Sequence, residues 1–217
     1  MLRRGKPLPA PDLSRPWRAA EFCVIDVETT GLDLRRDEII AYGAAIVTGA
    51  RIPFGRATYG LVRPSRPVSV PALAVHTLRT TDLAEAPTID QVVPELADLL
   101  SGRVLVAHAA WIERAFLNRA LRPHGLRLGR ATVDTAALMR ACRLADRDTD
   151  EEPNLEAASR RLGLPVHTPH HALGDAFTTA QLFLALATRL ETSAARGRKP
   201  RPLTVRHLCA ISRHHRR

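Results

Sequence analysis

A strand-like stretch that carries two acidic residues places the tightest constraint on how this chain folds. Residues 22–27 read Phe-Cys-Val-Ile-Asp-Val, and Glu-Thr-Thr-Gly follows directly. A short apolar run rich in β-branched residues and closed by Gly predicts a buried β-strand rather than a helix. Because strand side chains alternate between faces, Asp26 and Glu28 point to the same side, with Cα atoms roughly 6.5–7 Å apart. Ile25 and Val27 point to the other side, into a core.

The two acids of this strand raise a question of charge. Neighbouring carboxylates at the end of a buried strand repel each other and lose solvation, so another group must offset that cost. A divalent cation such as Mg²⁺ takes carboxylate oxygens as ligands. The alternative is a pair of solvated acids where the strand leaves the sheet, and the Asp-x-Glu pattern alone favours this alternative. The choice depends on whether further acids and a base join the pair.

Composition limits the class of protein. The chain has 217 residues, of which 45% are hydrophobic and 25% charged, as in one globular domain with tails. No apolar run approaches the roughly 18 residues of a membrane span, and no apolar segment follows the charged N-terminus as in a secretory signal. The three cysteines show no C-x-x-C spacing, which favours reduced thiols. We therefore expect a cytoplasmic protein that does not associate with membranes.

The net charge of +10 is concentrated at the two ends of the chain. Residues 1–20 contribute +4, residues 196–217 contribute +8, and the middle carries −2. Basic tails on a near-neutral domain fit a partner that carries phosphates, and they equally fit tails that only add solubility. We predict a flexible basic segment over 1–20, a folded domain over 21–195 and a basic tail over 196–217. An amphipathic piece at 203–211 fits either docking on a polymerase or binding of nucleic acid.

The order of predicted elements indicates the fold class. Strands at 22–27, 38–47 and 57–62, joined by short links, predict an antiparallel meander. A short helix is expected at 72–78. From residue 88 onward, helices alternate with short strands at 103–107 and 132–133. The predicted helices cover 88–101, 109–121, 134–145, 154–162 and 172–190. The sequence therefore predicts a mixed α/β sheet flanked by helices, without an internal repeat.

Two acids in the later helices interrupt their local pattern. Glu113 stands where the apolar stripe of helix 109–121 calls for an apolar residue. Its carboxylate either points inward at a site, or lies at the edge of the stripe and reaches water or Arg114. The pattern alone favours the position at the edge. Asp175 lies in the first turn of a long, almost wholly apolar helix, where the helix dipole also stabilises an acid.

A histidine precedes the second of these acids. Pro169 limits how far the helix extends backwards, so His170 lies in the loop or at the helix start. From there its side chain can swing over the carboxylate of Asp175. A lone His is more often structural, but a loop His beside a buried acid is a candidate general base.

The acids and the histidine together resemble a known family. Asp26-x-Glu28, Glu113 and His170-x4-Asp175, in this order, resemble the DEDDh 3′–5′ exonucleases, among them the epsilon-type proofreading subunit of bacterial DNA polymerase III and its stand-alone relatives. The resemblance rests on residues 24–32 (VIDVETTGL), 104–117 (VLVAHAAWIERAFL) and 170–183 (HHALGDAFTTAQLF), with Asp134-Thr135 between them. Two positions depart from the family: Ala109 replaces its usual Asn, and Glu113 replaces its usual Asp.

The resemblance implies a fold and a chemistry. It implies an RNase H-like sheet and a 3′–5′ exonuclease of proofreading or repair type that releases nucleoside 5′-monophosphates, with DNA favoured. The family uses two Mg²⁺ or Mn²⁺ ions roughly 3.5–4 Å apart. Asp26 would bridge them, Glu28 and Asp175 would complete one ion, and Glu113 would support the other. His170 would act as the general base.

The same resemblance implies the substrate contacts and the partners. Thr29, Thr30 and Gly31 would hold the terminal nucleotide, and Leu32 would press against its base. His108 would also contact the substrate. The partners would be nucleic-acid 3′ ends and, for an epsilon-type chain, a DNA polymerase subunit.

Three alternatives remain from the sequence. A zinc hydrolase could use His167, His170 and His171, although these lack a regular ligand spacing. A catalytically weak nucleic-acid-binding or polymerase-accessory module would fit Ala109, Glu113 and the basic tails. An RNA-directed exonuclease of the same fold would fit the same residues.

Overall fold

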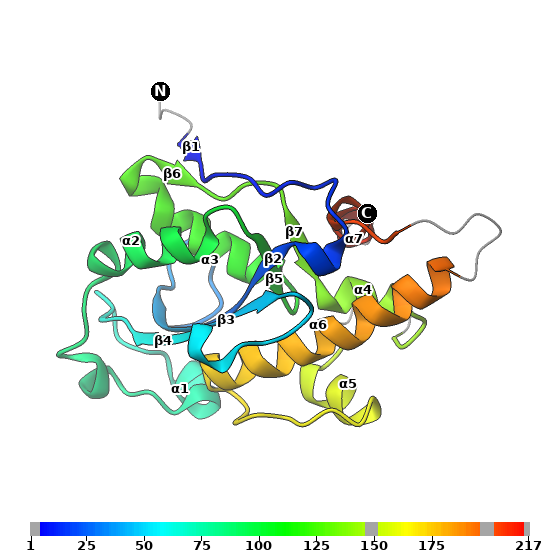
Figure 1. Ribbon diagram of the computed structural model, residues 1–217. Helices are drawn as coiled ribbons and strands as arrows, with labels where there is room; N and C mark the ends of the chain where they lie inside the picture. The colour runs from blue at the N-terminus through cyan, green and yellow to red at the C-terminus, as the bar shows by residue number, and fades with distance from the viewer. Residues whose placement is uncertain (1–4, 146–151, 196–201, 215–217) are drawn as a thin grey trace.

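A five-stranded mixed sheet forms the centre of the computed structural model, which describes residues 5–145, 152–195 and 202–214 (Figure 1). The strands are Glu21–Thr29 (β2), Ile39–Thr48 (β3), Ala57–Leu61 (β4), Val104–Ala107 (β5) and Thr132–Asp134 (β7). Their order is β4-β3-β2-β5-β7. The strands β2, β3 and β4 pair antiparallel, and β5 and β7 continue the sheet parallel to β2. The predicted meander and the mixed sheet are therefore confirmed, with strand ends within two residues of the prediction for β2, β3 and β4.

Helices cover both faces of this sheet (Figure 1). The helices are Val70–His76 (α1), Ile89–Leu100 (α2), Trp111–Leu121 (α3), Thr135–Ala141 (α4), Leu155–Arg161 (α5), Ala172–Ala195 (α6) and Val205–His214 (α7). Short 3-10 helices span Trp17–Ala19 (η1), Phe54–Arg56 (η2), Thr80–Leu83 (η3) and Arg122–His124 (η4). One core lies between the sheet and α6, α4 and α7, and the other lies between the sheet and α2 and α3.

The alternation of side chains along β2 decides which face its acids take. Phe22 and Val24 belong to the core under α6, whereas Cys23 and Ile25 belong to the core under α2 and α3. Because strand side chains alternate, Asp26 continues the row of Phe22 and Val24. The predicted separation of the two faces is confirmed, and it turns the acids of β2 toward the start of α6.

Gly43 determines how closely α6 approaches the sheet. It lies in β3 directly opposite Asp26. A Cβ added to Gly43 would overlap the backbone of Ala172 and Leu173 at the start of α6. The absence of a side chain therefore lets the first turn of α6, which carries Asp175, pack beside Asp26.

Several helix boundaries differ from the predicted ones. The helix expected from residue 109 begins at Trp111, because Ala109 adopts a left-handed conformation with φ of 55°. Such a conformation is uncommon for residues other than Gly and is several-fold enriched in Asn. The expected helix 134–145 ends at Ala141, and Arg143 just beyond it also has a positive φ of 57°. The short helix expected at 72–78 begins at Val70, because the hydroxyl of Ser69 accepts a hydrogen bond from the backbone N–H of Ala72.

The prediction of a flexible N-terminal segment is wrong for residues 5–20. Lys6–Pro7 (β1) pairs in parallel with Leu126–Arg127 (β6). Trp17 is only 1% exposed, packs edge-on against Phe183, and donates its indole N–H to Glu191 Oε1 at 2.9 Å. The prolines and charges of this segment favour a flexible chain, but the apolar surface of Trp17 anchors it to the domain. Residues 1–4 lie outside the described residues.

The C-terminal tail also differs from the prediction. Val205, Leu208 and Cys209 of α7 are buried in the core under α6, and Val205 N–H donates to the carbonyl of Arg15 at 3.1 Å. The predicted amphipathic piece therefore exists, but its apolar side packs on its own domain and is not available to a partner. Residues 196–201 and 215–217 of the tail lie outside the described residues.

The helices and the cysteines agree with what the composition led us to expect. Among the described residues, no helix is long and apolar enough to cross a bilayer. The cysteines Cys23, Cys142 and Cys209 are buried and form no disulfide, which confirms the prediction of free thiols.

Gly43→Ala tests how far the close packing of α6 on β3 contributes to the stability of the fold. We expect it to lower the free energy of unfolding by about 1–3 kcal/mol, because the new methyl group must displace the backbone of α6. Gly55→Ala is the matched control, since an added Cβ there meets nothing within 4 Å and Gly55 has no positive φ. Urea denaturation measures both variants, and equal midpoints for the two would contradict the prediction.

Candidate active site

A cleft of about 680 Å³ opens where β2 and β5 end, between the β2–β3 loop, α1 and the starts of α3, α5 and α6. The residues predicted from the sequence that line it are Asp26, Glu28, Thr29, Gly31, Leu32, His108, Glu113, His170 and Asp175. Thr30 is the one predicted site residue that does not line this cleft. The cleft therefore gathers residues that lie up to about 150 positions apart in the chain.

Three carboxylates meet at the floor of the cleft. One oxygen each of Asp26, Glu28 and Asp175 lies within 4.8 Å of the others. Asp26 and Glu28 come from β2, and Asp175 comes from the first turn of α6, which Gly43 allows to pack against the sheet. The solvated pair considered above is wrong for these acids, because they converge in a cleft instead of separating into solvent.

Burial and mutual repulsion make these carboxyls hard to ionise. Burial, and next the charge of Asp175, raise the pKa of Glu28 to about 7. Burial raises the pKa of Asp175 to about 6, although a hydrogen bond from the backbone of His170 opposes the rise. The pKa of Asp26 lies well above its usual range, because of burial first and then the charges of Glu113, Glu28 and Asp175. A divalent cation would reverse this balance, and hard carboxylate oxygens suit Mg²⁺ or Mn²⁺.

Glu113 points inward from the first turn of α3. It is 5% exposed, and its Oε2 has no hydrogen-bond partner among the described residues. Burial, and next the charges of Asp134 and Glu28, raise its pKa to about 8. The alternative of an acid reaching water or Arg114 is therefore wrong, since a guanidinium nitrogen of Arg114 donates instead to Thr132 Oγ1 and the carbonyl of Gly129. A buried carboxylate oxygen without a partner is costly, and it fits a fourth ligand for cations.

His170 reaches the site in a different way from the one expected. Its backbone N–H, not its ring, donates to Asp175 Oδ2 at 2.9 Å, and its φ is 58°. The imidazole is 55% exposed, and its Nε2 lies 3.8 Å from Glu156 Oε1 of α5. The ring therefore stands at the wall of the cleft near Glu156. The contact with Asp175 that the sequence suggested for the ring is made by the backbone of His170 instead.

The turn after β2 contains one supporting residue and one exposed apolar residue. Thr30 is buried: its hydroxyl donates to Asp37 Oδ1 at 2.8 Å and accepts from Glu38 N–H at 3.0 Å. A Cβ on Gly31 would meet the carboxylate of the same Asp37. Leu32, by contrast, is 77% exposed at the rim of the cleft. Thr30 thus holds the shape of the loop, and Leu32 offers apolar surface to a ligand.

His108 forms part of the cleft wall. Its Nδ1 is hydrogen-bonded to Thr135 Oγ1 at 2.8 Å, and its Nε2 is hydrogen-bonded to the carbonyl of Pro153. Burial, the largest cause, lowers its pKa. Because protein groups occupy both ring nitrogens, this side chain contributes shape to the cleft more than polar contacts.

The helix α1 forms a side of the cleft that was not predicted from the sequence. His76, at the end of this helix, is buried; its Nδ1 accepts from Leu78 N–H at 3.1 Å, so its Nε2 donates to the carbonyl of Thr29 at 3.2 Å. This bond ties α1 to the turn that follows β2. Val75 beside it is half exposed and lines the cleft. The only available signal was a His at the end of a predicted short helix.

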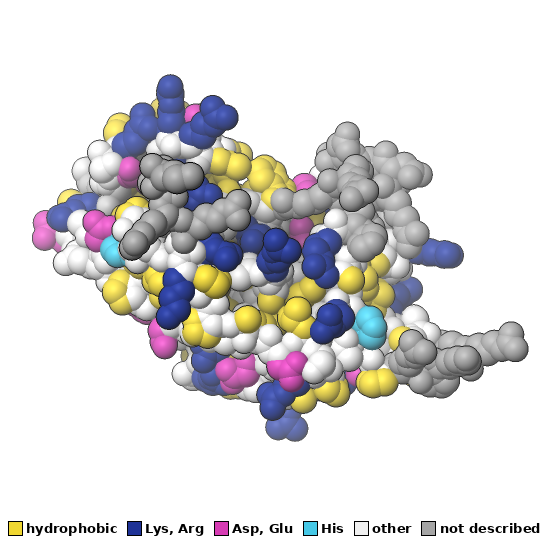
Figure 2. Space-filling model, turned by 90° about the horizontal axis from the view of Figure 1, so that it is seen from above, with side chains coloured by type: hydrophobic (Ala, Val, Ile, Leu, Met, Phe, Trp, Pro, Cys, Tyr) yellow, Lys and Arg dark blue, Asp and Glu magenta, His cyan; other side chains and the backbone are white. Residues whose placement is uncertain are grey.

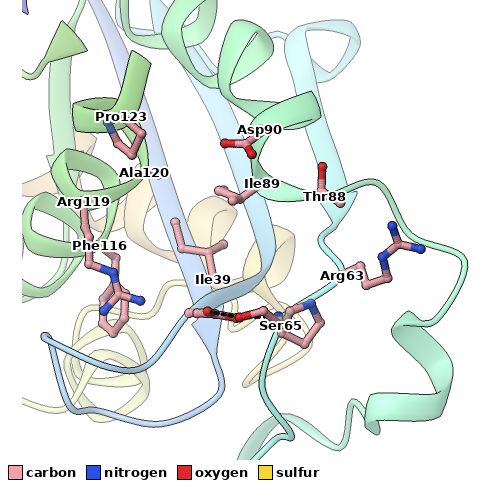
Figure 3. Close-up of a pocket in the computed structure, with 12 residues that line it drawn as sticks. Ile39, Arg63, Ser65, Thr88, Ile89, Asp90, Phe116, Arg119, Ala120 and Pro123 are labelled. Atoms are coloured by element: carbon pink, nitrogen blue, oxygen red, sulfur yellow. Dashed lines mark hydrogen bonds between the residues drawn. The ribbon is translucent and has the colours of Figure 1, made fainter. Parts of the chain in front are cut away.

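A second cavity of about 470 Å³ lies on the other side of the β2–β3 loop (Figure 3). Figure 3 shows Arg63 across this cavity from Arg119 and Phe116, with Ile39 and Ile89 between them. None of the four inward carboxylates lines it. Arg119 donates to the carbonyls of Leu34 and Arg36 at 3.2 and 3.3 Å, so this side fixes the loop that carries Leu32.

Comparison with known proteins agrees with this geometry. The exonuclease family model RNase_T matches residues 23–183. A DNA polymerase III subunit epsilon-like protein of Rhodobacter capsulatus is 35% identical over 185 residues, which are 84% of this chain and 25% of that protein. A PolC-type DNA polymerase III of Thermotoga maritima is 34% identical over 166 residues, 76% of this chain and 12% of that protein. The chain thus spans a quarter or less of the length of these relatives.

Solved structures extend the comparison. Exonuclease X in complex with 5′ overhanging duplex DNA superposes with a TM-score of 0.66 and 26% identity, over 88% of this chain and 99% of that one. E. coli exonuclease I in complex with a dT13 oligonucleotide has a TM-score of 0.66 at 13% identity, over 82% of this chain and 44% of that one, and so shares the fold. The predicted resemblance and the RNase H-like fold are confirmed. The chain belongs to the RNase_T exonuclease family.

Proposed function

We propose that this chain is a metal-dependent 3′–5′ exonuclease that releases nucleoside 5′-monophosphates from nucleic-acid 3′ ends, with DNA favoured, in proofreading or repair. The observation that supports this most is the convergence of Asp26, Glu28 and Asp175 within 4.8 Å, beside the unpartnered oxygen of Glu113. Family membership supports phosphodiester hydrolysis. A related structure that contains duplex DNA supports the choice of DNA.

The carboxylates would hold the metal ions. Asp26, Glu28 and Asp175 would bind one Mg²⁺ or Mn²⁺, and Asp26 and Glu113 would bind a second. When bound, such ions polarise the scissile phosphate, acidify a water and stabilise the leaving oxygen. The zinc alternative has less support, because one of its histidines, His171, stacks on Tyr59 instead of joining the carboxylates.

His170 would accept the proton of the attacking water at a ring nitrogen. The water oxygen forms a bond to phosphorus, the bond from phosphorus to the 3′-oxygen breaks, and that oxygen leaves with a proton from solvent. The half-exposed ring can pass its proton to solvent after each cycle. Glu156, whose Oε1 lies 3.8 Å from its Nε2, would orient the ring.

The rim of the cleft would hold the terminal nucleotide. Leu32 would press on the base from the β2–β3 loop, and Val75 would face it from α1, since both are exposed and line the cleft. Backbone groups of Thr29 and Gly31 would contact the sugar and phosphate. Thr30 would act through the shape of the loop, and His108 through the shape of the wall.

The proposed protein partner of this chain is a DNA polymerase subunit, as the name of the epsilon-like relative suggests. The alternative of a catalytically weak binding module rests on Ala109 and Glu113. The inward, unpartnered carboxylate of Glu113 favours the enzyme over this alternative. An RNA-directed exonuclease would use the same residues, and a panel of DNA and RNA 3′ ends distinguishes the two substrates.

Asp26→Asn tests the proposed activity. We expect it to abolish release of mononucleotides from DNA in Mg²⁺ or Mn²⁺, because it removes a charge that both ions need. Asp98→Asn, an exposed acid on α2, is the control and should retain wild-type rates. A 3′-label released in the first turnover, with a ladder from 5′-labelled DNA, would establish the direction. Undiminished activity of Asp26→Asn would refute the assignment.

His170→Ala tests the proposed general base. We expect the rate to fall at least roughly 10²-fold, while metal and DNA binding persist. His124→Ala is the control, since that side chain pairs with Asp90 away from the cleft. Single-turnover rates and calorimetric Mn²⁺ titrations separate the two effects. A variant that cleaves at the wild-type rate would remove His170 from the mechanism.

The raised carboxyl pKa values predict how pH affects stability. A folded pKa above the unfolded value favours folding at low pH, so the metal-free protein loses this stability as pH rises from the ordinary values near 4 through about 6, 7 and 8. Bound cations favour the ionised carboxyls instead. We expect Mn²⁺ to raise the Tm more at about pH 8 than at about pH 5. An equal rise at both pH values would contradict the site.

A further inference from the structure

A further hollow, distinct from the cleft and from the cavity of Figure 3, lies beside the first turn of α3, next to the candidate active site. It has a volume of about 360 Å³ and is lined by Ala110, Arg114, Arg130, Thr132, Asp134, Ser212 and Arg213. Trp111, 37% exposed, follows Ala110 of this hollow and precedes Ile112 and Glu113 of the cleft. On a helix, residues two apart point in roughly opposite directions, whereas residues three apart are neighbours. Trp111 therefore lies on the side of Arg114, and Glu113 lies on the side of the cleft.

Positive charge dominates this hollow. Arg114 comes from α3, Arg130 from the loop before β7, and Arg213 from α7. Among the lining residues that the structure describes, Asp134 is the one acid, and its two oxygens accept the backbone N–H groups of Ala136 and Ala110 at 3.0 and 3.2 Å. Burial, the largest cause, also raises its pKa, which favours the neutral form. One carboxyl group against three guanidinium groups leaves the described lining of the hollow net positive.

Two of the three arginines point into solvent and are available to a ligand. Within the described residues, the side chains of Arg130 and Arg213 are exposed and take part in none of the ion pairs. Arg114 is anchored by Thr132 and Gly129 and so lends a fixed charge to the wall. Figure 2 shows more broadly that Lys and Arg side chains gather across the middle of one face, with Asp and Glu mainly toward its edges.

The helix that carries Arg213 is held firmly in place. The hydroxyl of Ser212 accepts the backbone N–H of Asp134 at 2.9 Å and donates to the carbonyl of Leu208 at 3.1 Å. Leu208 and Val205 are fully buried under the same helix. Arg213 is thus presented by a packed element of the domain and not by a free tail.

The combination of groups indicates the chemistry of the ligand. Guanidinium groups form charge-assisted hydrogen bonds with phosphate oxygens and match their geometry. An exposed indole offers a flat surface on which a nucleobase stacks. Aromatic and cationic side chains along one groove are typical of surfaces that bind single-stranded nucleic acid with little sequence preference.

We propose that a single strand whose 3′ end occupies the cleft continues over Trp111, which stacks on one of its bases, and places a backbone phosphate among Arg114, Arg130 and Arg213. This inference rests on the proposed function for the position of the 3′ end. It makes the first turn of α3 the boundary between two subsites, with Glu113 facing the reacting phosphate and Trp111 facing the strand that follows. It also gives α7 a role in binding the substrate.

Binding measurements with substituted side chains test this path. Fluorescence anisotropy gives the Kd of a single-stranded DNA of about sixteen nucleotides in Ca²⁺, for Trp111→Ala and for the double variant R130Q/R213Q. We expect each Kd to rise about tenfold, the order expected when a stacked base or a phosphate contact is lost. Trp111→Phe should restore most of the affinity, because it restores an aromatic face.

Salt dependence and strand length distinguish the two contacts. The slope of log K against log salt should fall by about 0.7 per lost phosphate contact in R130Q/R213Q. It should not change in Trp111→Ala, because stacking releases no counterions. A dinucleotide, which fills only the cleft, should bind all variants alike.

The control removes the same charge elsewhere. R122Q/R206Q replaces two exposed arginines that line neither hollow, one of them also on α7. Equal Kd values for R122Q/R206Q and R130Q/R213Q, or a dinucleotide affinity that falls with that of the long strand, would overturn the inference. Mononucleotide release by the unmodified chain in Mn²⁺ tests the proposed function separately, and its failure leaves the binding comparison valid.

Discussion

Four carboxylates line one cleft, and the rest of the structure depends on how their repulsion is contained. Burial raises the pKa of all four, and the charges of neighbouring acids add to the rise, so the arrangement is unfavourable unless cations bind. The protein holds them in place by packing from several directions. The strand β2 lies at the centre of the sheet with helices on both faces, Gly43 admits the first turn of α6, and a backbone hydrogen bond from His170 holds Asp175.

The parts of this arrangement that follow from local rules could be predicted from the sequence. Alternation along a strand is enough to place Asp26 and Glu28 on one face, opposite Ile25. A single acid in an apolar stripe drew attention to Glu113, although the stripe alone favoured an acid at its edge, and the start of an apolar helix drew attention to Asp175. These inferences need only the period of each element. The order of the motifs along the chain then indicated that the three elements form one site, although the sequence gives no distances between them.

The rest depends on contacts between distant segments, which periodicity does not describe. Trp17 is buried because Phe183 and Glu191 meet it, and a Pro-rich context gave no sign of this. Thr30 looked like a substrate contact, but Asp37 binds its hydroxyl. The ring of His170 faces Glu156, which belongs to a helix that no motif connected with the site. In each case a partner that is distant in the sequence decides what the residue does.

The first turn of α3 shows how one local conformation affects both subsites. Because Ala109 takes a left-handed conformation, the helix begins at Trp111, and the burial of Phe116, Leu117 and Leu121 fixes the direction in which its residues point. A shift of one residue in the register of α3 against this core would rotate every side chain by about 100° and would turn Glu113 away from the carboxylates. The same rotation would carry Trp111 off the arginine-lined hollow. The turn at Ala109 and the packing of α3 therefore orient Glu113 and Trp111 together, and a substitution at Ala109 that disfavours the left-handed conformation should affect the carboxylate cluster and the proposed strand path alike.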